Sequence, residues 1–109
     1  MISASLGRTG VRLAVAAALS LYLGVAHAEE SKVTIDNFTF SPAEVKVKVG
    51  DTVTWTNHDD IPHTVVSAGK FRSKAMDTDN SFSFTFTSAG DYKYFCSLHP
   101  HMTGTITVE

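Results

Sequence analysis

The sequence predicts an all-β fold, a two-sheet β-sandwich of about seven to eight strands. Three observations support this fold class. Apolar and polar residues alternate with a period of two through most of the chain after residue 28. No stretch of that region shows the 3.6-residue period of an amphipathic helix. Turn-forming residues separate the alternating runs at regular intervals, as they do between the short strands of a sandwich.

The first strands are expected between residues 31 and 57. In each of them, apolar residues that face the core alternate with polar residues that face solvent. The inward residues are Val33 and Ile35 in "VTIDNFTF", Val45, Val47 and Val49 in "EVKVKVG", and Val53 and Trp55 in "DTVTWTN".

The later strands follow the same rule, after a stretch at 67–80 that has no clear period and is predicted as a long surface connection. The expected inward residues are Phe82, Phe84 and Phe86 in "SFSFTFT", and Ile106 and Val108 in "GTITVE". In "DYKYFC", Cys96 shares a face with Tyr92 and Tyr94, so the pleat points the cysteine toward the core.

Residues 1–28 read as a secretory signal peptide. Arg8 and Arg12 precede the uncharged run "LAVAAALSLYLGV", and Ala26-His27-Ala28 supplies an A-x-A cleavage pattern. The run is too short for a spanning helix, and no later segment is long and apolar enough to cross a membrane. We therefore expect cleavage after Ala28, one domain over residues 29–109 and a periplasmic location.

The composition of residues 29–109 narrows the function. Seven basic and eleven acidic side chains give a net charge of −4 and no basic patch, so nucleic acid is not an expected partner. A single cysteine cannot form an internal disulfide, and a monomer is expected. Asp59 and Asp60 are adjacent in a polar turn, which favours solvation over acid–base chemistry. We therefore do not expect an enzyme.

The segment "FCSLHPHMTG" concentrates metal-binding side chains near the C-terminus. Cys96, His99 and Met102 are spaced three apart, and a tight loop can point every third side chain at one centre. Thiolate, imidazole and thioether are soft ligands that suit copper better than magnesium, calcium or manganese. A blue copper centre needs a second histidine in addition.

Two histidines are candidates for that second position. His63 begins a predicted strand after Pro62 and shares its face with Val65, so it can point inward. His58 lies among polar residues in a predicted solvated turn and is the weaker candidate. Within the C-terminal loop, His101 follows His99 by two residues and is expected to point outward.

These stretches resemble the cupredoxins, the small blue copper proteins, and especially their amicyanin and plastocyanin branch. The matching segments are "SPAEVKVKVGDTVTW", "VTWTNHDDIPHTV", "FTFTSAGDYKYFCSLHPHM" and "GTITVE". The resemblance covers nearly all of residues 31–109, and C-x-x-H-x-x-M is the compact loop spacing of amicyanin-like members. It implies a Greek-key sandwich and one type 1 copper ion held by four ligands, namely His63, Cys96, His99 and Met102.

The sequence departs from the family at two positions beside the ligands. Thr64 stands where members often have an asparagine that ties the two ligand loops together, and threonine offers a hydroxyl without a carboxamide. His101 replaces a more apolar residue and makes the rim more polar. A further set of apolar residues would surround His99 and suit brief docking with a redox partner; it comprises Ile61, Pro62, Leu98 and Pro100.

The function implied by the resemblance is transfer of single electrons by Cu(II)/Cu(I) cycling between redox proteins, such as a donor dehydrogenase and a cytochrome-like acceptor. Three alternatives remain open. The first is a periplasmic copper carrier or chaperone that uses the same ligands. The second is a zinc site, for which methionine is a poor fourth ligand. The third is a metal-free binding sandwich in which Cys96 is inert.

Overall fold

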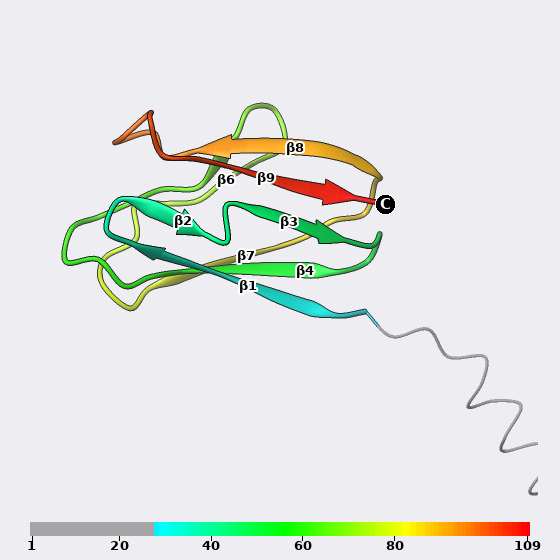
Figure 1. The fold of residues 1–109 in the computed structure, drawn as a ribbon, viewed down its shortest axis with the longest axis horizontal. Helices are drawn as coiled ribbons and strands as arrows, with labels where there is room; N and C mark the ends of the chain where they lie inside the picture. Colours follow the sequence, from blue (N-terminus) through cyan, green and yellow to red (C-terminus); the bar gives the residue numbers. More distant parts are fainter. Residues whose placement is uncertain (1–27) are drawn as a thin grey trace, which may run out of the picture.

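A computed structural model describes residues 28–109, which form two β-sheets (Figure 1). The described part contains strands and turns, with no helix long and apolar enough to cross a membrane. The signal-peptide prediction falls, apart from Ala28, outside the described residues. The nine strands of the described part are β1 (Glu30–Asp36), β2 (Thr39–Ser41), β3 (Glu44–Val47), β4 (Thr52–Asn57), β5 (Val66–Ser67), β6 (Phe71–Arg72), β7 (Ser81–Thr85), β8 (Gly90–Phe95) and β9 (Thr103–Val108).

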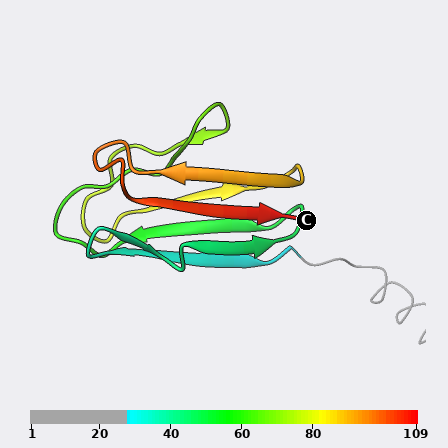
Figure 2. The same ribbon diagram turned by 45° about the horizontal axis from the view of Figure 1, so that its top comes forward.

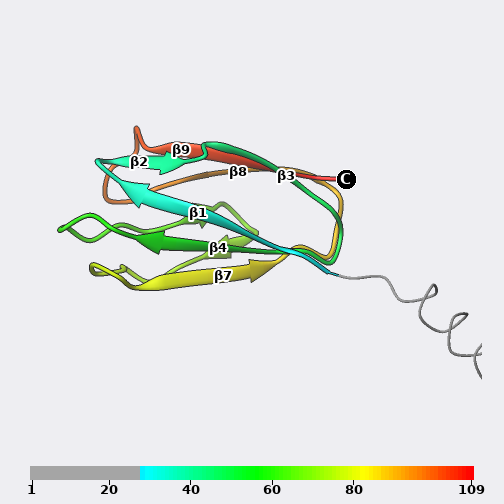
Figure 3. The same cartoon turned by 60° about the horizontal axis from the view of Figure 1, so that its bottom comes forward.

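The strands are arranged in one four-stranded and one five-stranded sheet, in the orders β2-β1-β4-β7 and β3-β9-β8-β5-β6. The β1–β4 and β3–β9 pairs are parallel, and the other pairs are antiparallel. Figure 3 shows the two layers, with β1, β4 and β7 in one and β8 and β9 in the other. The predicted two-sheet sandwich is confirmed. The sandwich has nine strands instead of the predicted seven to eight. The difference arises because β5 and β6 have only two residues each, too few for an alternating pattern to be recognised.

Alternation along the strands builds the core between the sheets. Trp55 is fully buried, and the register places it beside Val33 of β1 and Phe82 of β7. The centroids of its indole and of the Tyr94 ring in the opposite sheet are 5.3 Å apart, and the two rings pack edge-to-face. Full burial of a large apolar side chain contributes roughly 1.5–3 kcal/mol. Burial of these side chains between the sheets therefore stabilises the strands beneath the loops.

Two expectations about individual segments are wrong. Val49 is not inward: it is 50% exposed, because β3 ends at Val47 and the chain turns at Gly50, which has a φ of +98°. The segment at 67–80 is not only a surface connection. It contains β6, and Met76 within it is buried and forms an isolated backbone bridge with His63. The segment lacks a strand period because it contacts the core through single residues.

Three connections meet at one end of the sandwich. They are the β1–β2 turn, the segment that follows β4 and the β8–β9 loop, which lie at the end away from the C-terminus (Figures 1 and 2). The strands below them are held in two hydrogen-bonded sheets. Side chains from distant parts of the sequence can therefore be positioned together on a rigid base.

Candidate metal centre

The shape of the β8–β9 loop is set by backbone hydrogen bonds between residues three positions apart. His99 N–H donates to Cys96 O at 3.2 Å, and Met102 N–H donates to His99 O at 2.9 Å. Cys96 N–H in turn donates to Met102 O at 3.1 Å and closes the loop. Each turn begins and ends at one of the three predicted ligands. The C-x-x-H-x-x-M spacing therefore corresponds to consecutive tight turns, as the sequence suggested.

Asn57 organises the segment that carries the other histidine. This residue ends β4 and is fully buried. Its amide nitrogen donates to Ile61 O at 2.9 Å and to Met76 O at 2.8 Å, while its side-chain oxygen accepts the Asp59 N–H at 2.9 Å. The polar residues around His58 were predicted to form a solvated turn, and for the adjacent Asn57 this is wrong. The carboxamide satisfies buried backbone groups and fixes the chain that leads to His63.

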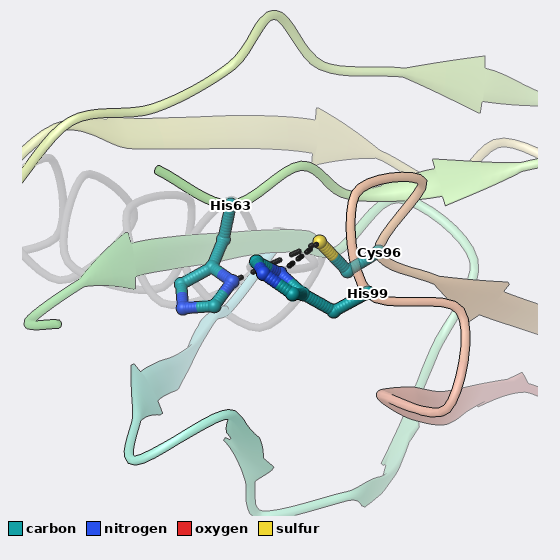
Figure 4. A group of neighbouring side chains, drawn as sticks. All are labelled: His63, Cys96 and His99. Atoms are coloured by element: carbon teal, nitrogen blue, oxygen red, sulfur yellow. Dashed lines mark hydrogen bonds between the residues drawn. The ribbon is translucent and has the colours of Figure 1, made fainter. Parts of the chain in front are cut away.

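Three donor atoms converge above the core. Cys96 Sγ lies 3.7 Å from His63 Nδ1 and 3.6 Å from His99 Nδ1, and the three donor atoms lie within 4.8 Å of one another. Figure 4 shows both rings turned toward the sulfur, one from the segment after β4 and one from the β8–β9 loop. An ion at bond lengths of about 2.0–2.3 Å would separate its sulfur and nitrogen donors by about 3.5–3.8 Å. The donor set therefore fits one metal ion.

Burial differs among the predicted ligands. His63 and Cys96 have no solvent-exposed surface, Met102 is 5% exposed, and His99 is half-buried. The Met102 side chain belongs to the same buried cluster as Cys96. Three of these groups are therefore shielded from water, and the His99 ring is the one that reaches the surface.

Asp59 orients His63, a role that the sequence interpretation missed. Its Oδ2 lies 2.7 Å from His63 Nε2, and its carboxylate also accepts the backbone N–H groups of Asn37 and Phe38. The Asp59 side chain is 11% exposed, so the expectation of a solvated carboxylate is wrong, whereas Asp60 is exposed. A proton on Nε2 leaves the Nδ1 lone pair free to face the metal position. A four-residue spacing brings side chains together only on a helix, and this segment is not helical, so the sequence held no local signal for the contact.

The charge of Asp59 is stabilised by these contacts. The hydrogen bond from Phe38 N–H is the strongest cause that lowers its pKa, which falls from 3.8 to about 2 despite partial burial. The His63 ring and the Asn37 N–H also lower it. At neutral pH the carboxylate is therefore ionised and accepts three hydrogen bonds.

Thr64 joins the two ligand segments. Its hydroxyl oxygen accepts the Ser97 N–H at 2.7 Å and lies 2.8 Å from Ser97 Oγ. The backbone N–H of Thr64 donates to Cys96 Sγ at 3.3 Å. The lack of a carboxamide therefore does not break the tie between the loops, because the hydroxyl reaches the same neighbouring loop.

The thiol of Cys96 is primed to ionise. Burial alone raises the pKa of the thiol. The hydrogen bonds with Thr64, His63 and His99 together lower it by more than burial raises it, and the pKa falls from 9.0 to about 6. The thiolate is the form that binds metals. The surroundings of the sulfur therefore favour the ligating form near neutral pH.

Phe38 is a second residue that sequence analysis did not identify. It lies in the β1–β2 turn at a φ of +57°, and its side chain is 50% exposed. The centroid of its ring lies 5.6 Å from that of the His63 ring and 5.0 Å from that of the His99 ring, and both pairs pack edge-to-face. The alternation pattern carries no signal for a turn residue of this kind. The ring covers one side of both imidazoles.

The remaining predicted residues lie outside the donor set. The His58 side chain is 50% exposed, and His101 is also exposed, so neither contributes to the donor set. The residues expected to border His99 comprise exposed Pro62, Leu98 and Pro100 and half-buried Ile61.

A two-sheet sandwich with one buried cysteine and two imidazoles in its end loops defines a small β-sheet metalloprotein. Comparison with known proteins identifies the family. Residues 27–109 match the copper binding proteins of the plastocyanin/azurin family, and the chain belongs to that family.

Individual relatives agree with this assignment. The chain is 39% identical to amicyanin from Paracoccus versutus in an alignment 83 positions long, which covers 71% of this chain and 63% of that protein. It is 32% identical to amicyanin-alpha from Methylorubrum extorquens, with coverage of 98% of this chain and 95% of that protein. The chain thus spans less than two thirds of the Paracoccus amicyanin and nearly all of the Methylorubrum protein.

Solved structures show the same likeness. The Cu(I) form of an amicyanin variant superposes with a TM-score of 0.71 at 36% identity, over 80% of this chain and 88% of that one. A purple cupredoxin from Nitrosopumilus maritimus gives a TM-score of 0.70 at 34% identity, over 72% of this chain and 99% of that one. The resemblance to cupredoxins is therefore confirmed in sequence and in fold.

Proposed function

We propose that this protein is a single-electron carrier with one type 1 copper ion bound by His63, Cys96, His99 and Met102. The observation that carries the proposal is the convergence of Cys96 Sγ with two imidazole Nδ1 atoms at 3.6 and 3.7 Å. Two histidines and a cysteine with a weak axial methionine form the ligand set of electron-transfer copper sites. Bound copper supplies the Cu(II)/Cu(I) couple.

The protein residues hold this ligand set in one geometry. Asp59 fixes the His63 ring through Nε2, and the Thr64 N–H fixes the Cys96 sulfur. The loop hydrogen bonds set the positions of His99 and Met102. Because the ligands are restrained from outside the metal position, the two oxidation states would share nearly the same arrangement, which lowers the cost of electron exchange.

Burial favours an electron carrier over a copper chaperone. A chaperone must release its ion quickly to a partner, whereas His63 and Cys96 have no exposed surface. The half-buried His99 ring provides a short path from the site to the surface. Leu98 and Pro100 beside it are exposed and would form part of the contact with a redox protein.

We also propose that the protein is not an enzyme. Within residues 28–109, His63, Cys96 and His99 make up the group of three or more potential metal-binding His, Cys, Asp or Glu residues, and a second cluster is not found there. The Asp59 carboxylate, a possible base, is occupied by one imidazole and two backbone N–H groups. Electron exchange with protein partners needs neither a second metal nor a base.

The cellular setting follows from the N-terminal sequence. We propose that residues 1–28 direct export and are removed, and that the domain over residues 29–109 works as a monomer in the periplasm. Its redox partners, a donor dehydrogenase or a cytochrome-like acceptor, would meet it there.

Copper titration of the purified protein tests the proposed function. We expect Cu(II) to produce an intense blue absorption that disappears in Cys96→Ser and persists in the control variants His58→Ala and His101→Ala. The ion should cycle reversibly in voltammetry and exchange slowly with a chelator. A colourless complex, or preferential binding of zinc, would contradict the proposal, and rapid transfer of copper to a chelator would favour the chaperone.

A further inference from the structure

The hydroxyl groups of Thr64 and Ser97 lie close together beside the Cys96 sulfur, which is one of the three donor atoms. Thr64 Oγ1 is 2.8 Å from Ser97 Oγ and 3.7 Å from Cys96 Sγ, and it accepts the Ser97 N–H at 2.7 Å. Thr64 is 6% exposed, whereas Ser97 is exposed to solvent. A threonine hydroxyl has one proton and two lone pairs, so the three contacts use its full capacity.

The surroundings determine where the Thr64 proton goes. The Ser97 N–H occupies one lone pair, which leaves the proton for either Ser97 Oγ or Cys96 Sγ. Ser97 is exposed and can exchange hydrogen bonds with water, whereas the Cys96 sulfur is fully buried. An ionised acceptor also forms a stronger hydrogen bond than a neutral one. The proton therefore points to the sulfur, and the Ser97 hydroxyl donates to the second lone pair of Thr64.

We propose that Thr64 is a positioning residue whose hydroxyl performs two separable tasks. Its oxygen ties the β8–β9 loop to the segment that carries His63, and its proton gives the Cys96 thiolate a second hydrogen bond besides that from the Thr64 N–H. The inference rests on the proposed electron-carrying function and adds a determinant of its reduction potential. An asparagine at this position, as the family resemblance implies, would lack the hydroxyl.

The second hydrogen bond has a defined electronic effect. A hydrogen-bonded thiolate gives less electron density to a bound cation, and Cu(II) depends on that density more than Cu(I) does. Hydrogen bonding around the cysteine sulfur is accordingly one of the factors that tune the potential of such sites. The Thr64 hydroxyl therefore favours the reduced form and raises the reduction potential.

Three substitutions at one position separate the tasks. Thr64→Ser keeps the oxygen and the proton, Thr64→Asn keeps a polar group for the loop tie, and Thr64→Val removes both. We expect the serine variant to match the wild type in redox equilibrium within about twofold. The asparagine and valine variants should shift toward Cu(II) by up to about tenfold, which for a one-electron couple is about 59 mV.

The measurements are the midpoint potential of the copper-loaded protein and the energy of its sulfur-to-copper absorption band. Loss of a hydrogen bond to the thiolate should move that band to lower energy. A purely structural role of Thr64 would alter the unfolding of the metal-free protein without this spectral shift. If Thr64→Val does not fold, the serine and asparagine variants still decide the question.

Ser97→Ala tests the direction of the proton. If the Thr64 proton already points to the sulfur, this variant should have an unchanged or slightly lower potential. A higher potential would mean that the proton pointed to Ser97 and was released by the substitution, and would overturn the proposal. Unchanged potential and absorption in Thr64→Val, or in Thr64→Asn if the valine variant does not fold, would also overturn it. Absence of the band in the wild type would instead reject the proposed function, and this inference with it.

Discussion

At the scale of single residues, Asp59 shows how a carboxylate can organise a metal centre without binding the metal. It connects three parts of the chain, because it accepts the Asn37 and Phe38 N–H groups of the β1–β2 turn and contacts His63 Nε2 at 2.7 Å. The same contacts place the Phe38 ring against both imidazoles. One side chain thus fixes the orientation of a ligand and positions the ring that covers it.

Replacement of Asp59 should reveal a stabilisation that depends on its charge. At pH 7 we expect Asp59→Asn to destabilise the metal-free protein by about 1.5–3 kcal/mol, the scale of a hydrogen bond to a charged group. The pKa of Asp59 is about 2 in the folded protein and ordinarily 3.8. Its stabilisation is therefore complete above about pH 4 and is lost as the pH falls through 2.

Urea unfolding of the metal-free wild type and variant between pH 7 and pH 2 would measure this dependence. The difference in free energy of unfolding between the two proteins should shrink below pH 4. Asp60→Asn is the matched control, because its side chain is exposed, and it should leave the free energy unchanged. A difference that stays constant down to pH 2 would show that the charge is not the cause.

Gly104 is required by the ring that lies over it. It pairs with Tyr94 across β8 and β9, and a Cβ atom at this position would fall on the Tyr94 phenol ring, overlapping Cζ and Oη. Tyr94 is 2% exposed and cannot move into solvent without loss of core packing. We expect Gly104→Ala to destabilise the protein by about 1–3 kcal/mol through overpacking.

Denaturant unfolding of a double-mutant cycle would test this explanation. Tyr94→Leu removes the ring, so Gly104→Ala should cost less in the Tyr94→Leu background than in the wild type. Equal costs in both backgrounds would assign the effect to the β9 backbone instead of the ring.

At the scale of whole elements, the sequence predicts what has a local period. Alternation identifies β1, β4, β7 and β9, and the three-residue spacing in the β8–β9 loop matches its hydrogen-bonded turns. The two-residue strands β5 and β6 have no detectable period. The roles of Asp59 and Phe38 depend on the approach of the β1–β2 turn to the segment after β4, and local pattern does not encode that long-range contact.

Ser73 attaches the irregular segment between β6 and β7 to the strand region before β5. Its hydroxyl accepts the Val65 N–H at 2.8 Å and donates to Lys74 O at 2.8 Å, and its own N–H donates to Val65 O at 2.9 Å. Ser73 is 6% exposed and Val65 is fully buried. Ser73→Ala would leave the buried Val65 N–H without its partner and should cost about 1–3 kcal/mol.

Ser83 is a matched control for Ser73, and it lies on β7, the strand that follows the Ser73 segment. Its hydroxyl contacts Thr54 Oγ1 at 2.7 Å, but this pair is exposed and water can replace it. In thermal or urea unfolding, Ser83→Ala should therefore cost less than Ser73→Ala. Equal costs would show that burial of the Val65 N–H is not the decisive factor.

At the scale of the whole molecule, the two ends of the sandwich have different roles. The candidate metal centre lies at the end with the β8–β9 loop, whereas β1 starts near the C-terminus at the other end (Figure 1). At that second end, Glu29 N donates to Asp51 Oδ1 at 3.0 Å, and Thr52 N donates to Glu29 O at 3.0 Å. Asp51 is 7% exposed and also accepts the Lys48 N–H.

Cleavage after Ala28 would place the new N-terminus at this contact. The Glu29 nitrogen would become an α-ammonium group, and its hydrogen bond to Asp51 would become an ion pair. The hydrogen bond from Glu29 already is the strongest cause that lowers the pKa of Asp51, so the carboxylate is charged at neutral pH. Removal of the signal peptide would thus attach the start of β1 more firmly to the sheet.

We therefore expect protein that begins at Glu29 to have a higher thermal midpoint at pH 6 than protein with one or more residues before it. A free α-amino group has a pKa of about 7.7–8.0, which the nearby carboxylate raises. The advantage should be complete below about pH 7 and be lost as the pH rises past the raised pKa. Asp51→Asn should abolish the difference between the two forms at every pH. Equal midpoints at pH 6 would show that no such ion pair forms when the chain is processed.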